Sequence, residues 1–219
     1  MPTKVSKILL IKNVTIYIIY LLIIWSFYRF LFPLPDQIGE LVIKPIFWLG
    51  PILFVFLKKE RARISSLGFT LKNLFSAIYL SIGLGSIFVV EALAANFFKY
   101  GGFSFGANIG SLPVMASLGL SFATAFSEET SFRGYIFSRL FMATGNELSA
   151  NLIQSIVWMF IHIPIAFFVW NYTLGAGILY LILTFAFGIG SAFIFARTKN
   201  IAGPIFLHVL WEWPIILFR

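Results

Sequence analysis

Long apolar runs, separated by short polar or turn-forming breaks, dominate the sequence. Seven such runs can be recognised, at residues 13–33, 38–57, 73–98, 112–140, 148–170, 173–196 and 201–218. A helix needs about 20 predominantly apolar residues to cross a bilayer, and most of these runs reach that length. Lys44 and Pro45 interrupt the second run and the last run is short, so either can also form a re-entrant or interfacial segment. The pattern predicts an all-α, polytopic bundle of about seven transmembrane helices.

The composition favours a chain embedded in lipid over a water-soluble one. Of the 219 residues, 60% are hydrophobic and 11% are charged, whereas soluble domains carry about 25% charged residues. No linker or low-complexity stretch divides the chain, so we expect a single membrane domain over residues 1–219, in a multi-pass protein of the cell membrane. Because the chain contains no cysteine, disulfides, thiolate metal sites and cysteine nucleophiles are excluded.

Basic residues gather at the ends of the apolar runs, and their distribution predicts the orientation. The net charge of +8 is therefore better explained by contact with the membrane and its lipids than by a nucleic-acid partner, and we expect none. Basic residues precede the first run, fill the break 58–72, end the fourth run at Arg139 and follow the sixth run. If seven spans alternate, all these positions lie on one side. The N-terminus is then cytoplasmic, and the glycine-rich loop 99–111 lies outside.

Six carboxylate and imidazole side chains lie inside the apolar runs, where a charge costs about 2.5–3.5 kcal/mol. They are Glu91, Glu128, Glu129, Glu212 and the only two histidines, His162 and His208. Glu128 and Glu129 project about 100° apart on a helix, and Arg133 lies one turn after Glu129. Glu129 and Arg133 can neutralise each other and leave Glu128 available for chemistry. A purely structural ion-pair network is the alternative interpretation. The sequence assigns no role to Glu91.

The two histidines lie where a helix can present them to a polar cavity. His162 precedes Pro164, which weakens the local hydrogen bonding of a helix and opens space for water or a substrate backbone. His208 and Glu212 are four residues apart on one helix face, where they can bind a metal, position a water or stabilise charge. Each histidine alone can also be an interhelical hydrogen-bonding group. One catalytic cavity would account for all these costly residues together.

Three motifs in the C-terminal half resemble those of the CAAX protease and bacteriocin-processing family, also called CPBP or Abi. They are, in the family's order, Glu128-Glu129-x-x-x-Arg133, Trp158-x-x-x-His162 and His208-x-x-x-Glu212. The stretch 196–205 before the third motif is also similar, and the resemblance covers residues 112–218, which we expect to form the catalytic core. Trp158 stands where the family usually has phenylalanine, and Glu212 where it usually has asparagine or aspartate.

The resemblance implies a membrane-embedded endopeptidase. Relatives include proteases that process prenylated proteins, proteins linked to bacteriocin maturation or self-immunity, and proteins with scaffold-like roles. The implied substrate is thus a membrane-associated peptide or protein, prenylated or leader-bearing. In this interpretation Glu128 activates a water that His162 orients, and the oxyanion is stabilised by His208 and Glu212. The residues that would support these groups are Glu129, Arg133 and Trp158.

Other chemistries and functions remain open on the sequence alone. Zn²⁺ or another divalent metal held by His162, His208 and Glu128 would also activate water. The lack of an H-E-x-x-H helix favours hydrolysis without a required cofactor. An aspartyl site fits worse, because Asp36 is the one aspartate and lies outside the runs. The rival functions are a weakly active or inactive scaffold or immunity protein, which Glu212 favours, and a transporter or proton relay, since intramembrane glutamate and histidine are typical of transporters.

Overall fold

A computed structural model describes residues 5–32, 34–104 and 113–217 of the chain. Positions 33, 112 and 218, at the ends of predicted spans, and positions 105–111 of the predicted outer loop lie outside the described residues. Within them the chain forms helices and no strand, which confirms the predicted all-α class.

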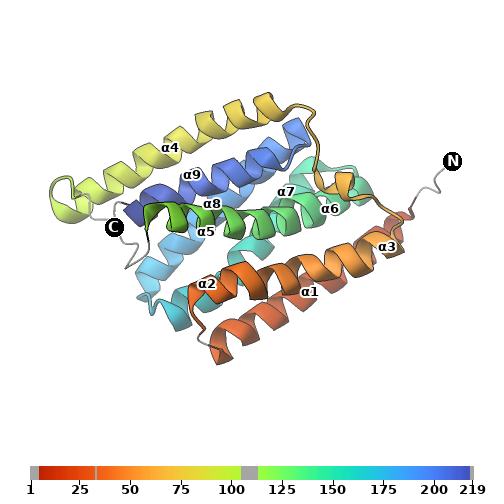
Figure 1. Cartoon of the computed structure of the whole chain (residues 1–219), viewed down its shortest axis with the longest axis horizontal. Helices are drawn as coiled ribbons and strands as arrows, with labels where there is room; N and C mark the ends of the chain where they lie inside the picture. Colours follow the sequence, from red (N-terminus) through yellow and green to blue (C-terminus); the bar gives the residue numbers. More distant parts are fainter. Residues whose placement is uncertain (1–4, 33, 105–112, 218–219) are drawn as a thin grey trace.

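The helical segments correspond in order to the seven apolar runs (Figure 1). They are α1 (Lys7–Leu31), α2 (Asp36–Ile38), η1 (Gly39–Ile43), η2 (Pro45–Leu49), η3 (Ile52–Phe56), α3 (Leu57–Lys59), η4 (Ile64–Leu67), α4 (Leu74–Tyr100), α5 (Val114–Glu129), η5 (Thr130–Phe137), α6 (Ser138–Thr144), α7 (Glu147–Ile161), η6 (Ile165–Val169), α8 (Leu174–Thr198) and α9 (Ala202–Leu217). Residues 36–59 form one continuous helix, here called the second rod, and residues 114–144 form another, the fourth rod.

Five described helices are long and apolar enough to cross a membrane. They are Lys7–Leu31, Gly39–Lys59, Leu74–Phe98, Glu147–Val169 and Leu174–Thr198. The fourth rod carries two glutamates and two arginines, which lower its hydropathy, and α9 has 16 residues. The protein is therefore a helical, multi-pass membrane protein with five candidate spans, and the seven-span topology stays a prediction.

Wide π-helical turns occur where prolines interrupt the α-helical hydrogen-bond ladder. Pro45 opens η2, and η3 and η6 begin directly after Pro51 and Pro164. Proline lacks a backbone N–H and clashes with the preceding turn, so a widened turn is a natural local solution. The second rod nevertheless stays helical through Lys44 and Pro45. The segment η5 is also π-helical but contains no proline, and such turns are frequent at functional sites.

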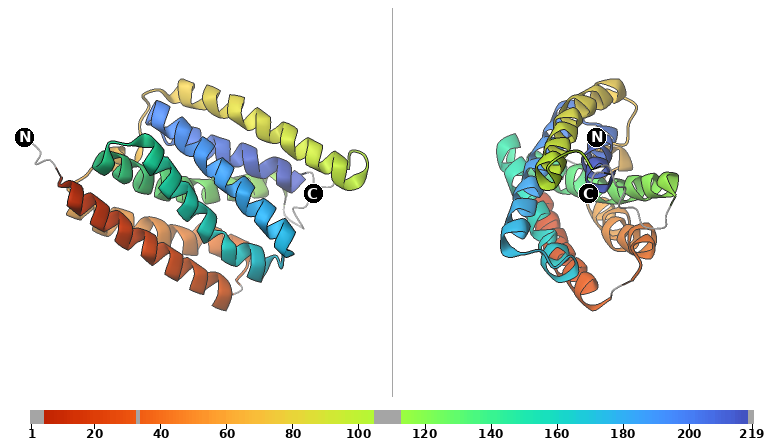
Figure 2. Two further views of the ribbon diagram at one scale, coloured as in Figure 1. Left: turned by 180° about the vertical axis from the view of Figure 1, so that it is seen from behind. Right: turned by 90° about the vertical axis from the view of Figure 1, so that its left-hand side faces the viewer.

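The bundle places α1 and the second rod on one side and α4 on the opposite side, with α5, α7, α8 and α9 between them (Figures 1 and 2). Helix α4 packs mainly on α9, α7 on α8, and α1 on α6 and α7. The core between them is strongly aromatic and includes Tyr17, Trp48, Phe132, Tyr135, Trp158 and Phe187. Large apolar side chains on α1, α4 and α8 face outward, as expected for lipid contact.

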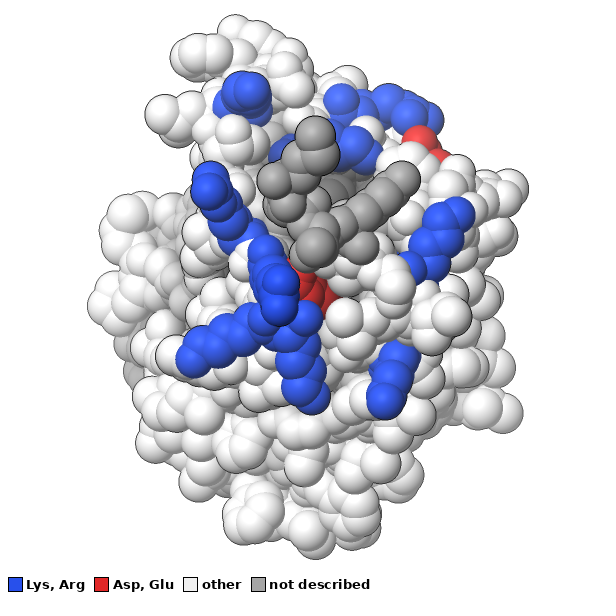
Figure 3. Space-filling view, turned by 90° about the vertical axis from the view of Figure 1, so that its right-hand side faces the viewer, with Lys and Arg blue, Asp and Glu red and all other residues white. Residues whose placement is uncertain are grey.

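Basic side chains gather at the end of the bundle where α1 begins, and Figure 3 shows this end. Lys7 opens α1, Lys58 and Lys59 lie in the last turn of α3, and Arg197 lies in the last turn of α8. This one-sided arrangement is the one that the positive-inside rule expects of a cytoplasmic face. The orientation itself stays a prediction.

A buried polar clamp fastens the second and fourth rods to α1 near this end. Arg139 Nε donates to Glu60 Oε2 at 2.9 Å, and the other carboxylate oxygen accepts from Tyr135 Oη at 2.7 Å and Asn13 Nδ2 at 3.1 Å. The guanidinium also donates to the Ser66 carbonyl and hydroxyl at 3.1 and 2.8 Å. Both charged side chains are 1% exposed. Because the pair is well hydrogen-bonded, these contacts offset the cost of burying its charges.

We expect Gly134→Ala to destabilise the protein by about 1–3 kcal/mol, the usual cost of overpacking. A Cβ at Gly134 would lie 2.8 Å from the Leu67 carbonyl oxygen, and this backbone atom is held in η4. Thermal unfolding in detergent measures the effect. Gly119→Ala is the matched control, because a Cβ there meets nothing within 4 Å. Equal melting temperatures for the two variants would contradict close packing of η4 on η5.

Candidate active site

The fully buried Glu129 ends α5 at the centre of the bundle, and its carboxylate makes three polar contacts. Arg133 donates to Oε1 at 3.0 Å, so the predicted ion pair is present, and Ser191 on α8 donates to Oε2 at 2.7 Å. His208 Nδ1 lies 2.7 Å from Oε1. The Arg133 guanidinium lies 4.5 Å above the Trp158 ring and 5.2 Å from that of Phe187. Glu129 thus joins α5, α8 and α9.

The Glu129 contact fixes the orientation of the His208 ring. A carboxylate paired with arginine accepts hydrogen bonds, so the ring nitrogen that contacts it, Nδ1, carries the hydrogen. The other nitrogen, Nε2, lies 3.9 Å from Glu128 Oε2. In the neutral ring Nε2 is an acceptor, and in the imidazolium it is a donor. The i, i+4 spacing made Glu212 the expected neighbour of His208, but the hydrogen bond goes to Glu129.

Glu128, 6% exposed, faces a cation that the sequence analysis did not assign to the site. Its Oε1 lies 2.5 Å from Nζ of Lys44, a buried residue of the second rod. Lys44 also pairs with Glu40, whose Oε2 accepts from Thr124 Oγ1 at 2.9 Å. A buried ion-pair chain therefore runs from the second rod to α5.

A signal for Lys44 was present in the sequence. A lysine inside an apolar run carries the same insertion cost as the acidic residues, and Glu40 precedes it by four residues, on the same helix face. Lys44 is named above only as an interruption of the second run, and Glu40 is not among the predicted site residues.

His162 follows the last residue of α7, where the helix breaks two residues before Pro164. Its Nδ1 lies 2.7 Å from the Trp158 carbonyl oxygen. Since a carbonyl accepts hydrogen bonds, Nδ1 carries the hydrogen and Nε2 is left as an acceptor. Glu128, Lys44 and His208 are the electrostatic neighbours of the ring. The fourth rod, the end of α7 and α9 thus bring the three candidate catalytic residues into one region.

Glu212 faces the same region from α9. Its neighbours include His208, Glu128 and the Ser121 side chain, and its Oε2 is buried without a hydrogen-bond partner among the described residues. The same holds for Ser127 Oγ and Thr130 Oγ1, on either side of the glutamate pair. Buried polar atoms are costly when they are unpaired, so each of these three atoms favours a polar partner.

The candidate metal ligands do not gather into a metal site. No group of three or more histidine, aspartate or glutamate side chains among the described residues is arranged to hold an ion. Lys44 already neutralises Glu128, and Glu129 engages Nδ1 of His208. Glu91, which the sequence left without a role, is exposed on α4 and forms no hydrogen bond or ion pair within the described part of the chain.

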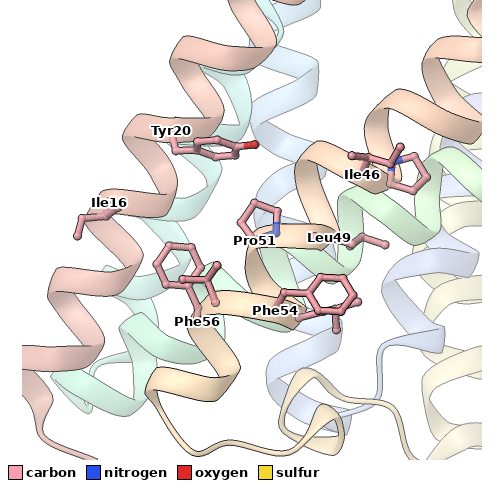
Figure 4. A pocket seen from close by; sticks show the side chains of 11 residues that line it. Ile16, Tyr20, Ile46, Leu49, Pro51, Phe54 and Phe56 are labelled. Carbon is pink, nitrogen blue, oxygen red and sulfur yellow. The ribbon is translucent and has the colours of Figure 1, made fainter.

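An apolar groove lies outside this cluster, between α1 and the second rod (Figure 4). It has a volume of about 800 Å³. Its lining is Ile16, Tyr20, Pro45, Ile46, Leu49, Gly50, Pro51, Leu53, Phe54, Val55 and Phe56. Its lining includes Pro45, which follows Lys44 directly in the chain. Its lining suits an apolar chain rather than a polar ligand.

Residues 110–214 match the family model of the type II CAAX prenyl endopeptidases, described as Rce1-like. The matched segment contains all three motifs, so the resemblance seen in the sequence is confirmed. No curated protein and no solved structure matches the chain.

Proposed function

We propose that this chain, which belongs to the Rce1-like family of CAAX prenyl endopeptidases, hydrolyses a peptide bond of a membrane-associated or lipidated peptide or protein. It would do so as a multi-pass protein of the cell membrane with a cytoplasmic N-terminus. The observation that carries the proposal is the convergence of Glu128, His162 and His208 from three separate helices. The family is a protease family, and this constellation contains the groups that water activation requires.

The proposed reaction starts from a water between Glu128 and His162. Nε2 of His162 accepts one hydrogen bond from the water and orients it, while the Glu128 carboxylate removes its other proton. The water oxygen bonds to the peptide carbonyl carbon, and the carbonyl oxygen becomes an oxyanion. When the C–N bond then breaks, Glu128 returns the proton to the leaving amine nitrogen. The resemblance gives His208 and Glu212 the role of stabilising the oxyanion, and each can donate a hydrogen bond there only when protonated.

The contacts of the candidate metal ligands favour the metal-free form of this reaction. Lys44 already neutralises the Glu128 carboxylate, and the described residues form no three-donor group. The apolar groove between α1 and the second rod supports a lipid-bearing substrate, because its apolar lining suits a lipid chain.

A catalytically inactive scaffold or immunity protein is the second candidate function. The observation that favours it is the ion pair between Glu128 and Lys44, since a carboxylate held by an ammonium is a weaker proton acceptor. In that case the buried charges would hold the second rod against α5 and carry no chemistry.

Purified full-length protein in proteoliposomes is expected to cleave members of a peptide library that carries or lacks a lipid chain. Mass spectrometry of the products gives the cleaved bond. A chelator is expected to leave the rate unchanged, and the lipidated peptides are expected to react with the lower KM. Lack of cleavage for every peptide would support the scaffold. Activity that a chelator removes and Zn²⁺ restores would establish a metal enzyme.

A further inference from the structure

The four ionisable groups assigned to the candidate site offer acceptors rather than donors when both histidines are neutral and both carboxylates are ionised. Ser127 and Thr130 also carry hydroxyl donors without a partner among the described residues, but these donors are neutral. Glu128 is an acceptor when ionised, and so is Glu212. His162 and His208 each have Nδ1 engaged, by the Trp158 carbonyl and by Glu129, so that their neutral rings offer acceptors at Nε2. Peptide hydrolysis needs hydrogen-bond donors at the position of the oxyanion, because preorganised donors stabilise its negative charge. A charged donor that does not depend on protonating these groups must therefore come from elsewhere.

Lys44 has the properties of such a donor. Its ammonium carries three N–H groups, and Glu40 and Glu128 are its partners among the described residues. The third N–H thus has no hydrogen-bond acceptor among the described residues. Lys44 is 2% exposed, and the centroids of the Trp25 and Trp48 rings lie 5.1 and 5.4 Å from Nζ. These contacts hold the cation in place before a substrate arrives, and such preorganisation makes an electrostatic donor effective.

Arg133 does not fill this position, although it is also a buried cation. One of its terminal nitrogens donates to Glu129 at 3.0 Å and the other lies 3.4 Å from the Gly188 carbonyl oxygen. The guanidinium lies between aromatic rings and its side chain is 0% exposed. Its Nε has no hydrogen-bond partner among the described residues, but the contacts of its terminal nitrogens go to Glu129 and to α8. Lys44 instead contacts the catalytic carboxylate directly.

We propose that Lys44 is a catalytic residue that donates its third N–H to the oxyanion formed when water attacks the substrate. The proposal rests on the endopeptidase function proposed above. No proton leaves Lys44 during the step. Its hydrogen bond strengthens as the carbonyl oxygen gains negative charge and weakens again when the C–N bond breaks and Glu128 protonates the amine. Lys44 contacts the Glu128 carboxylate, and in the proposed reaction the same carboxylate activates the water, so the donor lies close to that water.

The test compares Lys44→Met/Glu40→Gln with wild-type protein. Removing Lys44 alone leaves two buried carboxylates without their cation, which endangers folding, whereas the double variant removes one charge of each sign. Because Glu128 alone then lacks its cation, we expect the double variant to have a melting temperature between those of Lys44→Met and the wild type. Its kcat should fall about 10²–10³-fold, the usual effect of removing one oxyanion donor, with little change in KM. Lys58→Met, an exposed site on the same rod, is the matched control and should behave as wild type.

A second variant distinguishes the loss of a hydrogen-bond donor to the oxyanion from the loss of the positive charge beside Glu128. Adding Glu212→Gln to the double variant places an amide donor in the same region, and we expect it to restore at least about tenfold of the lost kcat, part of the oxyanion contribution. A folded Lys44→Met/Glu40→Gln protein with wild-type kcat would overturn the role of Lys44 and leave the endopeptidase intact. If the double variant does not fold, Lys44→Arg carries the test, and its loss of kcat at unchanged KM is the expected result. Wild-type protein that cleaves no peptide would overturn the proposed function as well.

Discussion

Glu128→Gln is expected to lower kcat for peptide cleavage by about 10³–10⁴-fold, the upper range for loss of a general base. Glutamine has nearly the same shape as glutamate, but its amide cannot take a proton from water. Glu128 sits beside Lys44 and His208 and has little solvent access, so bulk water cannot easily substitute for it. Initial rates in proteoliposomes, with the peptide that the wild type cleaves fastest, measure the effect.

The control for this variant is Glu147→Gln. Glu147 pairs with Arg197 at the surface, away from the catalytic cluster, and both side chains are partly exposed. It should keep the wild-type rate and melting temperature, because exposed ion pairs contribute about 0–1 kcal/mol. Glu128→Gln should remain folded, since its amide can still accept a hydrogen bond from Lys44. A folded Glu128→Gln protein with more than about a tenth of the wild-type kcat would be incompatible with general-base catalysis at this position.

Arg139→Met is expected to have the largest effect on stability, about 3–5 kcal/mol, as found when one partner of a buried ion pair is removed. The substitution leaves the Glu60 carboxylate buried and uncompensated, and it also removes the donors to Ser66. Thermal unfolding in detergent, followed by a fluorescent dye or by proteolysis, measures the loss. The loop 60–73 should become sensitive to proteases before the rods unfold.

Two further variants test whether the unpaired Glu60 carboxylate causes the loss of stability in Arg139→Met. Glu60→Gln/Arg139→Met removes both charges and should recover a substantial part of the stability, because the remaining groups are neutral. Arg197→Met breaks the surface pair with Glu147 and should cost less than about 1 kcal/mol. If Arg139→Met and Arg197→Met unfolded at the same temperature, the clamp would have no special role.

The helices could be predicted because lipid imposes a simple rule on the sequence. Apolar runs of membrane length must become helices to satisfy their backbone hydrogen bonds, and each predicted run is a helix in the structure. The rule gave no means of deciding whether Lys44 and Pro45 break the second run. They do not break it, since the turns widen after proline and the buried lysine is neutralised by Glu40 and Glu128.

The site could be predicted only where its contacts are local. The Glu129–Arg133 pair follows from helical spacing, and it is present. The contact between Lys44 and Glu128 joins residues that are 84 positions apart, and it depends on how the second rod packs on α5. The hydrogen bond between His208 and Glu129 could not be predicted for the same reason. Local spacing favours Glu212, but packing brings the more deeply buried Glu129 to Nδ1.

The continuity of the fourth rod sets how far the proposed catalytic carboxylate lies from the basic end of the bundle. Glu128 and Arg139 belong to one unbroken helix and are 11 positions apart, with the whole of η5 between them. The arginine end is held in the clamp near the basic end, so the two groups keep a fixed separation. Under the proposed function, the rod would therefore determine the depth of cleavage, and a bond that remains at the membrane surface would lie out of reach whatever its sequence.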